Sequence, residues 1–444
     1  MNKKFVVVVL LALVFVLSVS MIFAQSSSIQ LPKYNGPAVT LTFWSWVPGI
    51  SNSIAKFEQA YPKIKINYVN VGANFTEYNK LLTALSAGSG APDVAQIEYQ
   101  VLPTFISYGG LVDLSKYGAN NYKPLFVPWT WGQVSRGNAV YAIPQDTGPL
   151  ALAYNKAIFE KYGLTVPKTW EEFLNDAKKL YKESKGQVYM TNFNAKGASN
   201  VNWLVGLFWA AGGHLWTYNG NTWTQTINSP INKRVINYWG KMVDNGYAST
   251  YEPFTSDWYN NLSNGKIASM ISAAWLPLLL ANNLSKQYAG QWRIVPLPYF
   301  AGEKPTSGNW GGSTDAVTIQ SKHPEAAMIF ALWLNANPLS TTLDNENGGL
   351  FPAAISGLKD PSMHNTSTKT DQFFGGQDVN QAFFNASNIV NVNFTWAPWA
   401  NYFFNSLANY MNDAINGKMA WDQALDQLQT STLNYAKNQG FNVK

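Results

Sequence analysis

The sequence predicts an α/β protein built from two lobes that share several chain crossings. The early part of the chain alternates between strand and helix patterns, and strands that alternate with helices form parallel sheets. Two glycine-containing segments, 145–149 and 308–313, interrupt strand patterns far apart in the chain, and no low-complexity linker separates consecutive domains. The chain is therefore expected to cross between the lobes more than once. Its 444 residues, 46% of them hydrophobic, are enough for two cores.

Residues 1–24 have the pattern of a secretory signal peptide. Lys3 and Lys4 form a basic tip, residues 5–17 are almost entirely apolar, and small residues precede Gln25. The alternative is an uncleaved membrane anchor, since the stretch approaches the roughly 20 residues that span a bilayer. We favour cleavage, which predicts a secreted, periplasmic and soluble mature chain. The chain has no cysteine, so a lipid attachment site behind the signal is excluded.

The first elements form a βαβ unit. Residues 39–43 alternate as a strand, and a helix follows from about residue 50. The helix ends before Pro62, and residues 64–69 form the second strand. Because a helix connects the two strands, we expect them to pair in parallel.

The remaining elements follow from the same periodicities and from capping signals. Thr169 lies three residues before Glu172, which is the spacing of a capping box and predicts a helix start. The other predicted helices cover residues 78–85, 203–211, 324–335, 398–416 and 419–439. The other predicted strands cover residues 93–97, 140–144, 150–154, 267–272, 291–296 and 316–319.

Composition and motifs exclude several classes of function. Without cysteine there are no disulfides, thiol enzymes or cysteine-ligated metals. The three histidines, His214, His323 and His364, are never at metal-ligand spacing, and we expect each to lie at the surface or in a hydrogen bond. No phosphate-binding glycine loop is present, so nucleotide binding is not expected. We predict neither a metal nor a cofactor. Without Lys3 and Lys4 the mature chain has 29 basic and 25 acidic residues, and this balance of +4 is too small for a nucleic-acid-binding surface.

A secreted glycoside hydrolase is the enzyme class that the composition leaves open, because two carboxylates suffice to hydrolyse a glycosidic bond. The candidate carboxylates are Glu98, Asp146, Asp257 and Asp315, and none has a local motif that distinguishes an acid from a nucleophile. We therefore predict a protein without catalytic residues, with a hydrolase as the alternative.

The predicted binding site consists mainly of residues that follow strands, since open α/β sheets bind ligands beyond the carboxyl ends of their strands. Aromatic side chains there alternate with carboxylate, amide and hydroxyl groups. This combination suits a sugar, whose ring faces stack on aromatic plates and whose hydroxyls need hydrogen-bond partners. The predicted ligand-binding residues are Trp44, Ser45, Trp46, Glu98, Tyr99, Gln145, Asp146, Asn200, Asn202, Trp203, Trp275, Asn309, Trp310, Gly312, Ser313, Trp396 and Trp399.

The 18 tryptophans divide between packing and binding. Those inside amphipathic helices or at a helix start are assigned to packing, namely Trp170, Trp239, Trp333 and Trp421. Those flanked by Ser, Pro or Gly at element ends are assigned to binding, namely Trp44, Trp46, Trp275 and Trp310. Both roles stay open for Trp203, Trp396 and Trp399, whereas packing or a place at the groove rim is favoured for Trp209, Trp216 and Trp258.

Several segments occur in an order that resembles one family. They are Leu41-Thr42-Phe43-Trp44-Ser45-Trp46 with Tyr61-Pro62, Ala91-Pro92-Asp93-Val94 before residues 110–114, residues 141–149 running to Tyr154-Asn155-Lys156, residues 166–173, Ala211-Gly212-Gly213, Ala274-Trp275, Pro296-Leu297-Pro298, Gly311-Gly312-Ser313 and residues 415–418. Their order resembles the extracellular solute-binding proteins of ABC importers, specifically the maltose-binding-like sugar branch.

The resemblance implies a periplasmic-binding-protein fold with discontinuous lobes and about three hinge crossings. Residues 25–147 and 313–355 would form lobe one, and residues 148–312 and 356–444 lobe two. Sugar would bind between the closing lobes. Trp44, Glu98 and Asp146 would contribute from lobe one or the hinge, and Trp203, Trp275 and Trp310 from lobe two or the crossing.

The resemblance also implies partners. The closed protein would dock on the membrane permease of an ABC importer, and we expect a monomer that binds an oligosaccharide. The abundance of aromatic plates favours a longer, flatter ligand, for example a β-linked gluco-, xylo- or manno-oligosaccharide. The same fold with a peptide, a polyamine or a metal complex as ligand is a further alternative.

Overall fold

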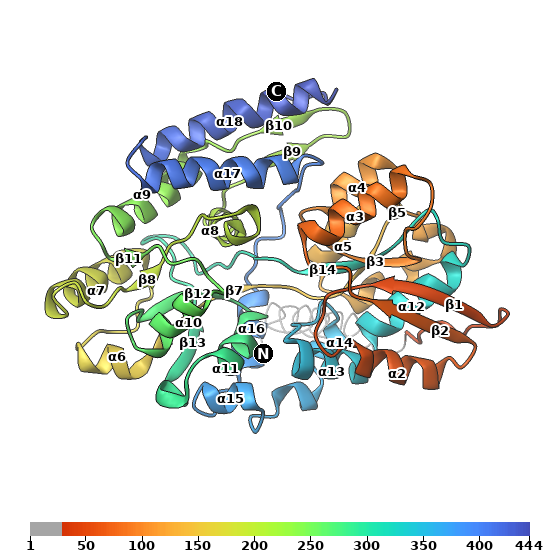
Figure 1. The fold of residues 1–444 in the computed structure, drawn as a ribbon, viewed down its shortest axis with the longest axis horizontal. Helices are drawn as coiled ribbons and strands as arrows, with labels where there is room; N and C mark the ends of the chain where they lie inside the picture. The colour runs from red at the N-terminus through yellow and green to blue at the C-terminus, as the bar shows by residue number, and fades with distance from the viewer. Residues whose placement is uncertain (1–28) are drawn as a thin grey trace, which may run out of the picture.

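The computed structural model describes residues 29–444, and the predicted signal peptide lies outside this range. The protein is a mixed α/β structure with two lobes, as predicted (Figure 1). The lobes are organised around a five-stranded and a three-stranded sheet. Among the described residues, no helix combines the length and the apolar character needed to cross a membrane.

The five-stranded sheet has the strand order β2-β1-β3-β14-β6. Strand β1 pairs in parallel with β2 and β3, and β14 runs antiparallel to β3 and β6. The predicted βαβ unit and its parallel pairing are therefore confirmed. The strands are β1 (Val39–Trp44), β2 (Ile64–Val69), β3 (Val94–Glu98), β6 (Ile143–Pro144) and β14 (Ser313–Val317). The helices associated with this sheet include α2 (Ile50–Ala60), α3 (Phe75–Ser86), α4 (Leu102–Tyr108), α5 (Pro128–Val134), α12 (Pro324–Ala336), α13 (Pro338–Gly348) and α14 (Ile355–Leu358).

The three-stranded sheet places β7 between β12 and β13, with both pairings antiparallel. Its strands are β7 (Leu150–Asn155), β12 (Ser269–Ala273) and β13 (Trp292–Pro296). The helices of this part are α6 (Lys156–Lys161), α7 (Trp170–Glu183), α8 (Asn202–Ala210), α9 (Pro230–Asp244), α10 (Ser256–Ser263), α11 (Leu276–Asn283), α15 (Lys369–Phe373), α16 (Val379–Ser387), α17 (Ala400–Ile415) and α18 (Trp421–Asn438). The predicted capping box begins α7, and α17 packs along α18 at the top of Figure 1.

Three short strand pairs complete the fold. They are β4 (Ser135–Arg136) with β5 (Ala139–Val140), β8 (Thr191–Asn192) with β11 (Ala248–Ser249), and β9 (Trp216–Tyr218) with β10 (Trp223–Gln225).

The bounds of most predicted strands agree with the structure to within two residues, and two strands differ more. The expected strand 140–144 is divided, because Val140 pairs with Ser135 in a hairpin whereas Ile143 pairs with Asp315 in the large sheet. The expected strand 316–319 begins earlier, at Ser313, which pairs with Glu98. The pairing of β14 with β3 thus starts at the last residue of the glycine-containing segment 308–313. The sequence pattern alone did not indicate this start.

Three chain segments lie side by side between the two sheets, and they contain Gly148, Trp310 and Phe351 respectively. Gly148 O accepts a hydrogen bond from Trp310 N at 2.8 Å, which joins the first two segments. Thr147 N donates to Phe351 O at 2.8 Å, which joins the third. These contacts place three connections where the resemblance implies hinge crossings. The residue bounds of the two lobes remain a prediction.

The tryptophans assigned to packing are buried. Trp170, Trp239, Trp333 and Trp421 are each at most 7% exposed. The rings of Trp170 and Trp239 meet edge to face with centroids 5.7 Å apart, a favourable geometry for aromatic pairs. Their packing role is confirmed.

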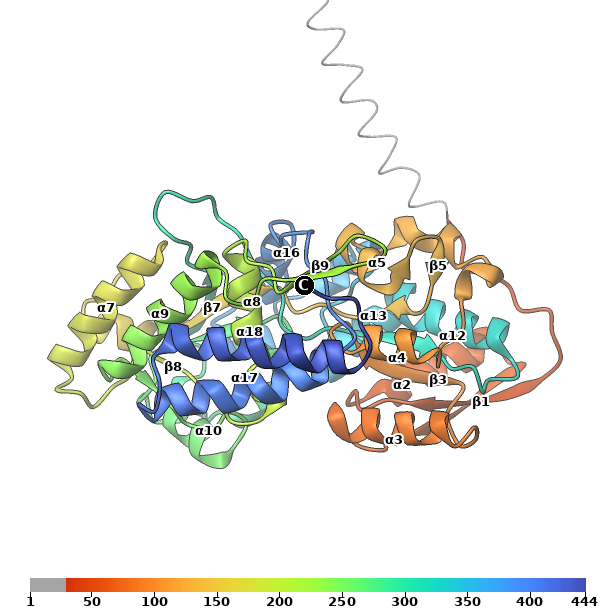
Figure 2. The ribbon, with the colours of Figure 1, turned by 90° about the horizontal axis from the view of Figure 1, so that it is seen from above.

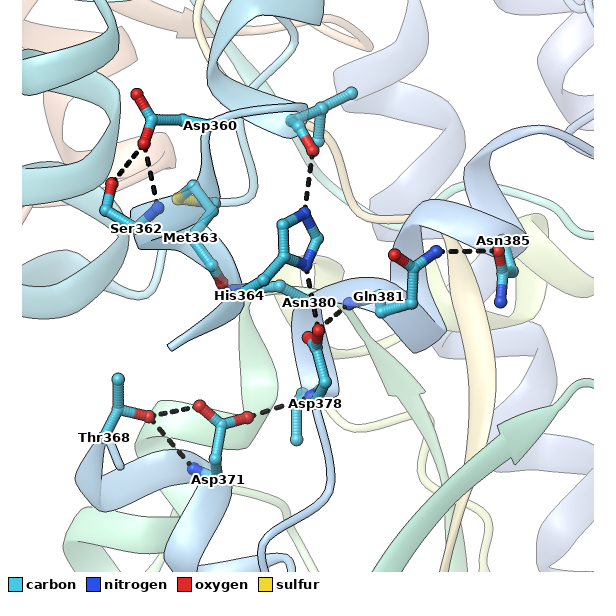
Figure 3. A network of polar contacts seen from close by, with 12 residues as sticks. Asp360, Ser362, Met363, His364, Thr368, Asp371, Asp378, Asn380, Gln381 and Asn385 are labelled. Carbon is cyan, nitrogen blue, oxygen red and sulfur yellow. Dashed lines mark hydrogen bonds and ion pairs between the residues drawn. The ribbon is translucent and has the colours of Figure 1, made fainter. Parts of the chain in front are cut away.

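A short 3-10 helix between α14 and α15, Pro361–His364, contains one of the three histidines (Figure 3). His364 Nδ1 lies 3.0 Å from Asp378 Oδ2, and its Nε2 lies 3.1 Å from Leu358 O. Asp378 also caps α16 by accepting from Gln381 N at 2.8 Å. His364 is thus a hydrogen-bonded structural residue, as predicted.

Candidate ligand-binding site

A cavity of about 340 Å³ lies where the carboxyl ends of β1 and β3 meet the chain crossings. Trp46 follows β1, Glu98 ends β3, and Ser313 begins the antiparallel strand β14 at the same edge. The opposite wall comes from segments that belong with the three-stranded sheet, including Trp275 at the start of α11. The cavity therefore lies at the strand ends, where open α/β sheets bind ligands, and between both parts of the protein.

Aromatic side chains form much of the cavity wall. Trp275 and Trp310 meet edge to face with centroids 4.8 Å apart. Trp275 Nε1 also donates to Trp310 O at 2.9 Å, which fixes the orientation of the ring. Trp46 approaches the cavity from the other side, held edge to face against Tyr78 at 5.9 Å. The remaining aromatic lining residues are Phe75, Phe254 and Phe404.

Two carboxylates lie beside these rings. Glu98 Oε2 accepts from Tyr78 Oη at 2.9 Å, and Asp146 Oδ1 accepts from Ser313 N at 2.6 Å. Burial raises the pKa of Glu98 above its ordinary value, although hydrogen bonds from Gln100 and Tyr78 oppose this. Burial also raises the pKa of Asp146 to about 7, with Glu98 and Asp315 contributing repulsion. Both carboxyl groups line the cavity and provide hydrogen-bonding groups for a ligand.

Amide groups add further hydrogen-bonding capacity. Asn202 is 6% exposed, and its Oδ1 is buried without a hydrogen-bond partner although the residue lines the cavity. A buried acceptor without a partner is costly, so a ligand donor at this position would be stabilising. Gln96 lines the same cavity and donates through Nε2 to Ser313 Oγ at 3.0 Å.

The predicted site residues fall into two groups in the structure. Those that line the cavity are Trp46, Glu98, Asp146, Asn200, Asn202, Trp275, Trp310, Gly312 and Ser313. The predicted residues outside its lining are Trp44, Ser45, Tyr99, Gln145, Trp203, Asn309, Trp396 and Trp399.

Several of the residues outside the lining support those that form it. Ser45 Oγ donates to Gln96 Oε1 at 2.7 Å, and Asn309 Oδ1 accepts from Gly148 N at 2.8 Å. Gln145 Nε2 donates to Asp315 Oδ2 at 3.2 Å. These contacts hold the strand ends and the crossings in place behind the cavity.

The others pack or end a strand. Trp44 is the half-buried last residue of β1, and Tyr99 packs against Trp129 with centroids 5.7 Å apart. Trp203 is 5% exposed and donates through Nε1 to Asn194 O at 3.0 Å. Trp396 and Trp399 are buried and both contact the Trp216 ring.

Sequence reasoning missed several lining residues. Gln96 lies on β3 and Gln100 lies just beyond its end. Both alternate with Glu98 along the chain, and this alternation was a signal that could have identified them. Asn74 and Phe254 have positive backbone φ angles of 52° and 65°, which are uncommon for residues other than glycine and gave no sequence signal. Phe404 comes from α17, more than 300 positions after Glu98.

The lining is acidic and contains no basic side chain. Glu98 and Asp146 are its ionisable residues, and no lysine, arginine or histidine belongs to the described lining. Residues 29–444 also contain no group of three or more His, Cys, Asp or Glu residues arranged to hold a metal ion. The arrangement thus offers aromatic faces and hydrogen-bond acceptors, and it disfavours anionic ligands.

The buried carboxyl groups predict a pH-dependent stability. Burial raises the pKa of Asp146 and Asp315 to about 7 and that of Asp344 to about 8. The folded state therefore binds more protons than the unfolded chain between about pH 4 and pH 8. The stabilising effect of these protons is complete below about pH 4 and is lost as the pH rises through the folded pKa values. We expect a higher melting temperature at pH 5 than at pH 8.

Thermal unfolding of the Asp315→Asn variant tests whether buried carboxyl groups cause this pH dependence. Asp315 Oδ2 accepts from Gln145 and Asn335, whereas its Oδ1 is buried without a partner. An asparagine oxygen keeps the two bonds and introduces no charge. The melting temperature of the variant should therefore depend less on pH than that of the wild type. A wild-type melting temperature that rises from pH 5 to pH 8 would contradict this explanation.

Comparison with known proteins agrees with this geometry. The model of the family described as bacterial extracellular solute-binding protein matches residues 44–338, which is more than half of the chain. The chain belongs to this family. The resemblance inferred from the order of its sequence segments is thereby confirmed. Members of this family are extracellular proteins that bind solutes.

Matches to solved structures of similar proteins cover nearly the whole length of this solute-binding protein. An ABC transporter associated binding protein from B. animalis subsp. lactis, solved with β-1,6-galactobiose, is 31% identical. The match covers 92% of this chain and 100% of that one, with a TM-score of 0.79. The galacto-N-biose/lacto-N-biose I-binding protein from Bifidobacterium longum, solved with lacto-N-biose, is 27% identical, with coverages of 93% and 100% and a TM-score of 0.81.

A curated relative is also similar in sequence. The arabinooligosaccharide-binding protein of Halalkalibacterium halodurans is 26% identical over 310 residues, which make up 66% of each chain. The alignments with the first curated relatives thus span slightly less than two thirds of their length.

Proposed function

We propose that this solute-binding protein captures an oligosaccharide between its two lobes and delivers it to the permease of an ABC importer. The observation that carries the proposal is the cavity wall, which combines Trp46, Trp275 and Trp310 with the carboxyl groups of Glu98 and Asp146. Aromatic plates suit the C–H faces of sugar rings, and carboxylates accept hydrogen bonds from hydroxyl groups. The ligands of the similar proteins are sugars as well.

Ligand capture requires contacts with both lobes. A ligand shifts an equilibrium between open and closed states only if it binds the closed state more tightly. Trp46 and Glu98 are attached to the five-stranded sheet, whereas Trp275 follows β12 of the three-stranded sheet. A sugar held by all three side chains would favour the closed state.

We also propose the type of ligand, the location of the protein and its oligomeric state. The acidic lining favours a neutral oligosaccharide, with β-linked gluco-, xylo- and manno-oligosaccharides as candidates beside the arabino- and galacto-sugars of the relatives. Residues 1–24 would direct export and be removed, leaving a monomeric binding protein in the periplasm. It would carry out no chemistry on its ligand.

Isothermal titration calorimetry against a sugar panel tests the proposal. The panel contains arabino-, galacto-, gluco-, xylo- and manno-oligosaccharides, with spermidine and a short peptide as non-sugar ligands. We expect saturable one-to-one binding of at least one oligosaccharide, which is recovered unchanged after prolonged incubation. Binding of spermidine or the peptide alone would contradict the sugar assignment, and release of reducing ends would show a hydrolase instead.

Phe254 provides a test within the cavity wall. Its φ of 65° is in the left-handed region, and its ring lies 6.2 Å from the Trp275 ring. Such a conformation costs a residue other than glycine about 1–2 kcal/mol and is often retained at ligand sites. We expect Phe254→Gly to raise the melting temperature while weakening oligosaccharide binding at least about fivefold, because the ring is lost.

Lys185→Gly is the matched control. Lys185 has a φ of 55° but follows α7, away from the cavity lining. This variant should gain stability in the same way and bind sugar as the wild type does. Equal sugar affinity of Phe254→Gly and the wild type in calorimetry would show that the Phe254 ring has no role in binding.

A further inference from the structure

A second cavity of about 480 Å³ adjoins the ligand cavity, and we call it the outer chamber. The two share Phe75, Ala198 and Asn200 in their linings, so they form adjacent spaces. The ligand cavity, at about 340 Å³, is near the lower end of the roughly 300–1,000 Å³ of small-molecule sites. An elongated ligand that fills it has the outer chamber as its continuation.

Both lobes contribute to the outer chamber. Phe75 and Asn79 lie on α3, whereas Asn401 and Asn405 lie on the first turns of α17. Figures 1 and 2 both show the beginning of α17 directed toward the lobe that contains α3. The contact is close, since Thr104 Oγ1 of α4 donates to Pro398 O at 2.7 Å just before α17. A ligand in the outer chamber would therefore also touch both lobes.

The chemistry of the outer chamber differs from that of the ligand cavity. Its wall has one aromatic side chain, Phe75 at the junction, and its polar groups are four asparagine amides together with Lys196 and Glu252. Asn401 Oδ1 is buried without a hydrogen-bond partner. Asn405 is exposed, and within the described part of the chain its Nδ2 donates only to Asn401 O, one helical turn earlier. An amide both donates and accepts hydrogen bonds, so this wall matches the hydroxyl rim of a sugar more than its ring face.

We propose that the outer chamber is a second sugar subsite, which holds the outer units of an oligosaccharide whose inner units fill the ligand cavity. This inference rests on the proposed function and adds the length of the ligand. It makes the protein a receptor for oligosaccharides of three or more units. Disaccharides would occupy only the ligand cavity.

Calorimetry with arabino-, galacto-, gluco-, xylo- and manno-oligosaccharides of two to six units tests the subsite. In the series that binds, we expect the dissociation constant to fall about tenfold between two and four units, which corresponds to one or two net hydrogen bonds. Equal affinity for the disaccharide and the tetrasaccharide would overturn the subsite and leave the proposed function intact. Absence of binding by every sugar would overturn both.

Variants at the start of α17 test whether the outer chamber causes this gain in affinity. Asn405→Ala and Asn405→Trp, of which the second places a bulky ring at the chamber wall, should weaken binding of the tetrasaccharide and leave that of the disaccharide within about twofold. Asn416→Ala is the matched control, because Asn416 Nδ2 also bonds the carbonyl four residues earlier but lies outside both linings. Equal tetrasaccharide affinity of Asn405→Trp and the control would overturn the proposal.

Discussion

We expect the Trp275→Ala variant to bind oligosaccharide about 100-fold more weakly than the wild type, a loss of about 3 kcal/mol. The half-buried indole faces the cavity and is fixed by its hydrogen bond to Trp310 O. Alanine removes a stacking surface and releases the Trp310 ring, which packs edge to face against it. Isothermal titration with the oligosaccharide that binds the wild type measures the loss.

Trp421→Ala separates this effect from a general loss of stability. Trp421 is 7% exposed on α18, where its Nε1 donates to the Asp244 carboxylate and its ring meets Phe193 at 5.3 Å. It lies outside the cavity lining, so its removal should lower the melting temperature and leave the sugar affinity within about twofold. Wild-type affinity of Trp275→Ala would refute the assignment of this cavity as the sugar site.

Gly148→Ala should disrupt the crossings behind the cavity. A Cβ atom at this position would lie 1.9 Å from Trp310 O and 3.0 Å from Trp275 Nε1. The backbone would have to move, and the bond from Trp310 N to Gly148 O at 2.8 Å would be strained. We expect a loss of about 3 kcal/mol in the free energy of unfolding, together with weakened sugar binding.

Gly132→Ala is the control for this substitution. Gly132 lies inside α5, and a Cβ atom there has no neighbour within 4 Å. Alanine should stabilise the helix by about 0.5–1 kcal/mol. Chemical denaturation measures both variants, and equal stability of Gly148→Ala and the wild type would show that the crossings are not tightly packed.

Local patterns were sufficient to predict most of the framework. Alternation and helix periodicity identified the βαβ unit, and the capping box at Thr169 located the start of α7. The rule that ligands bind beyond strand ends pointed to Trp46 and Glu98, which the structure brings into one cavity with Trp275. These features depend on short stretches of chain, so the sequence contains their signals.

The features of the site that the sequence did not predict depend on contacts between distant parts of the chain. Trp396 and Trp399 lie in a loop with proline, which suggested a binding role, but the structure buries them against Trp216. Phe404 lines the cavity only because α17 returns to the first lobe from the end of the chain. Phe254 enters it through a left-handed backbone conformation. No local periodicity encodes contacts of this kind.

A crystal structure with the oligosaccharide that binds most tightly in the panel would show where the sugar binds. We expect sugar rings in the cavity between the lobes, stacked on Trp46, Trp275 or Trp310. Sugar hydroxyls should lie within hydrogen-bond distance of Glu98 and Asp146. A sugar bound elsewhere on the protein, without contacts to these five side chains, would show that this cavity is not the sugar-binding site.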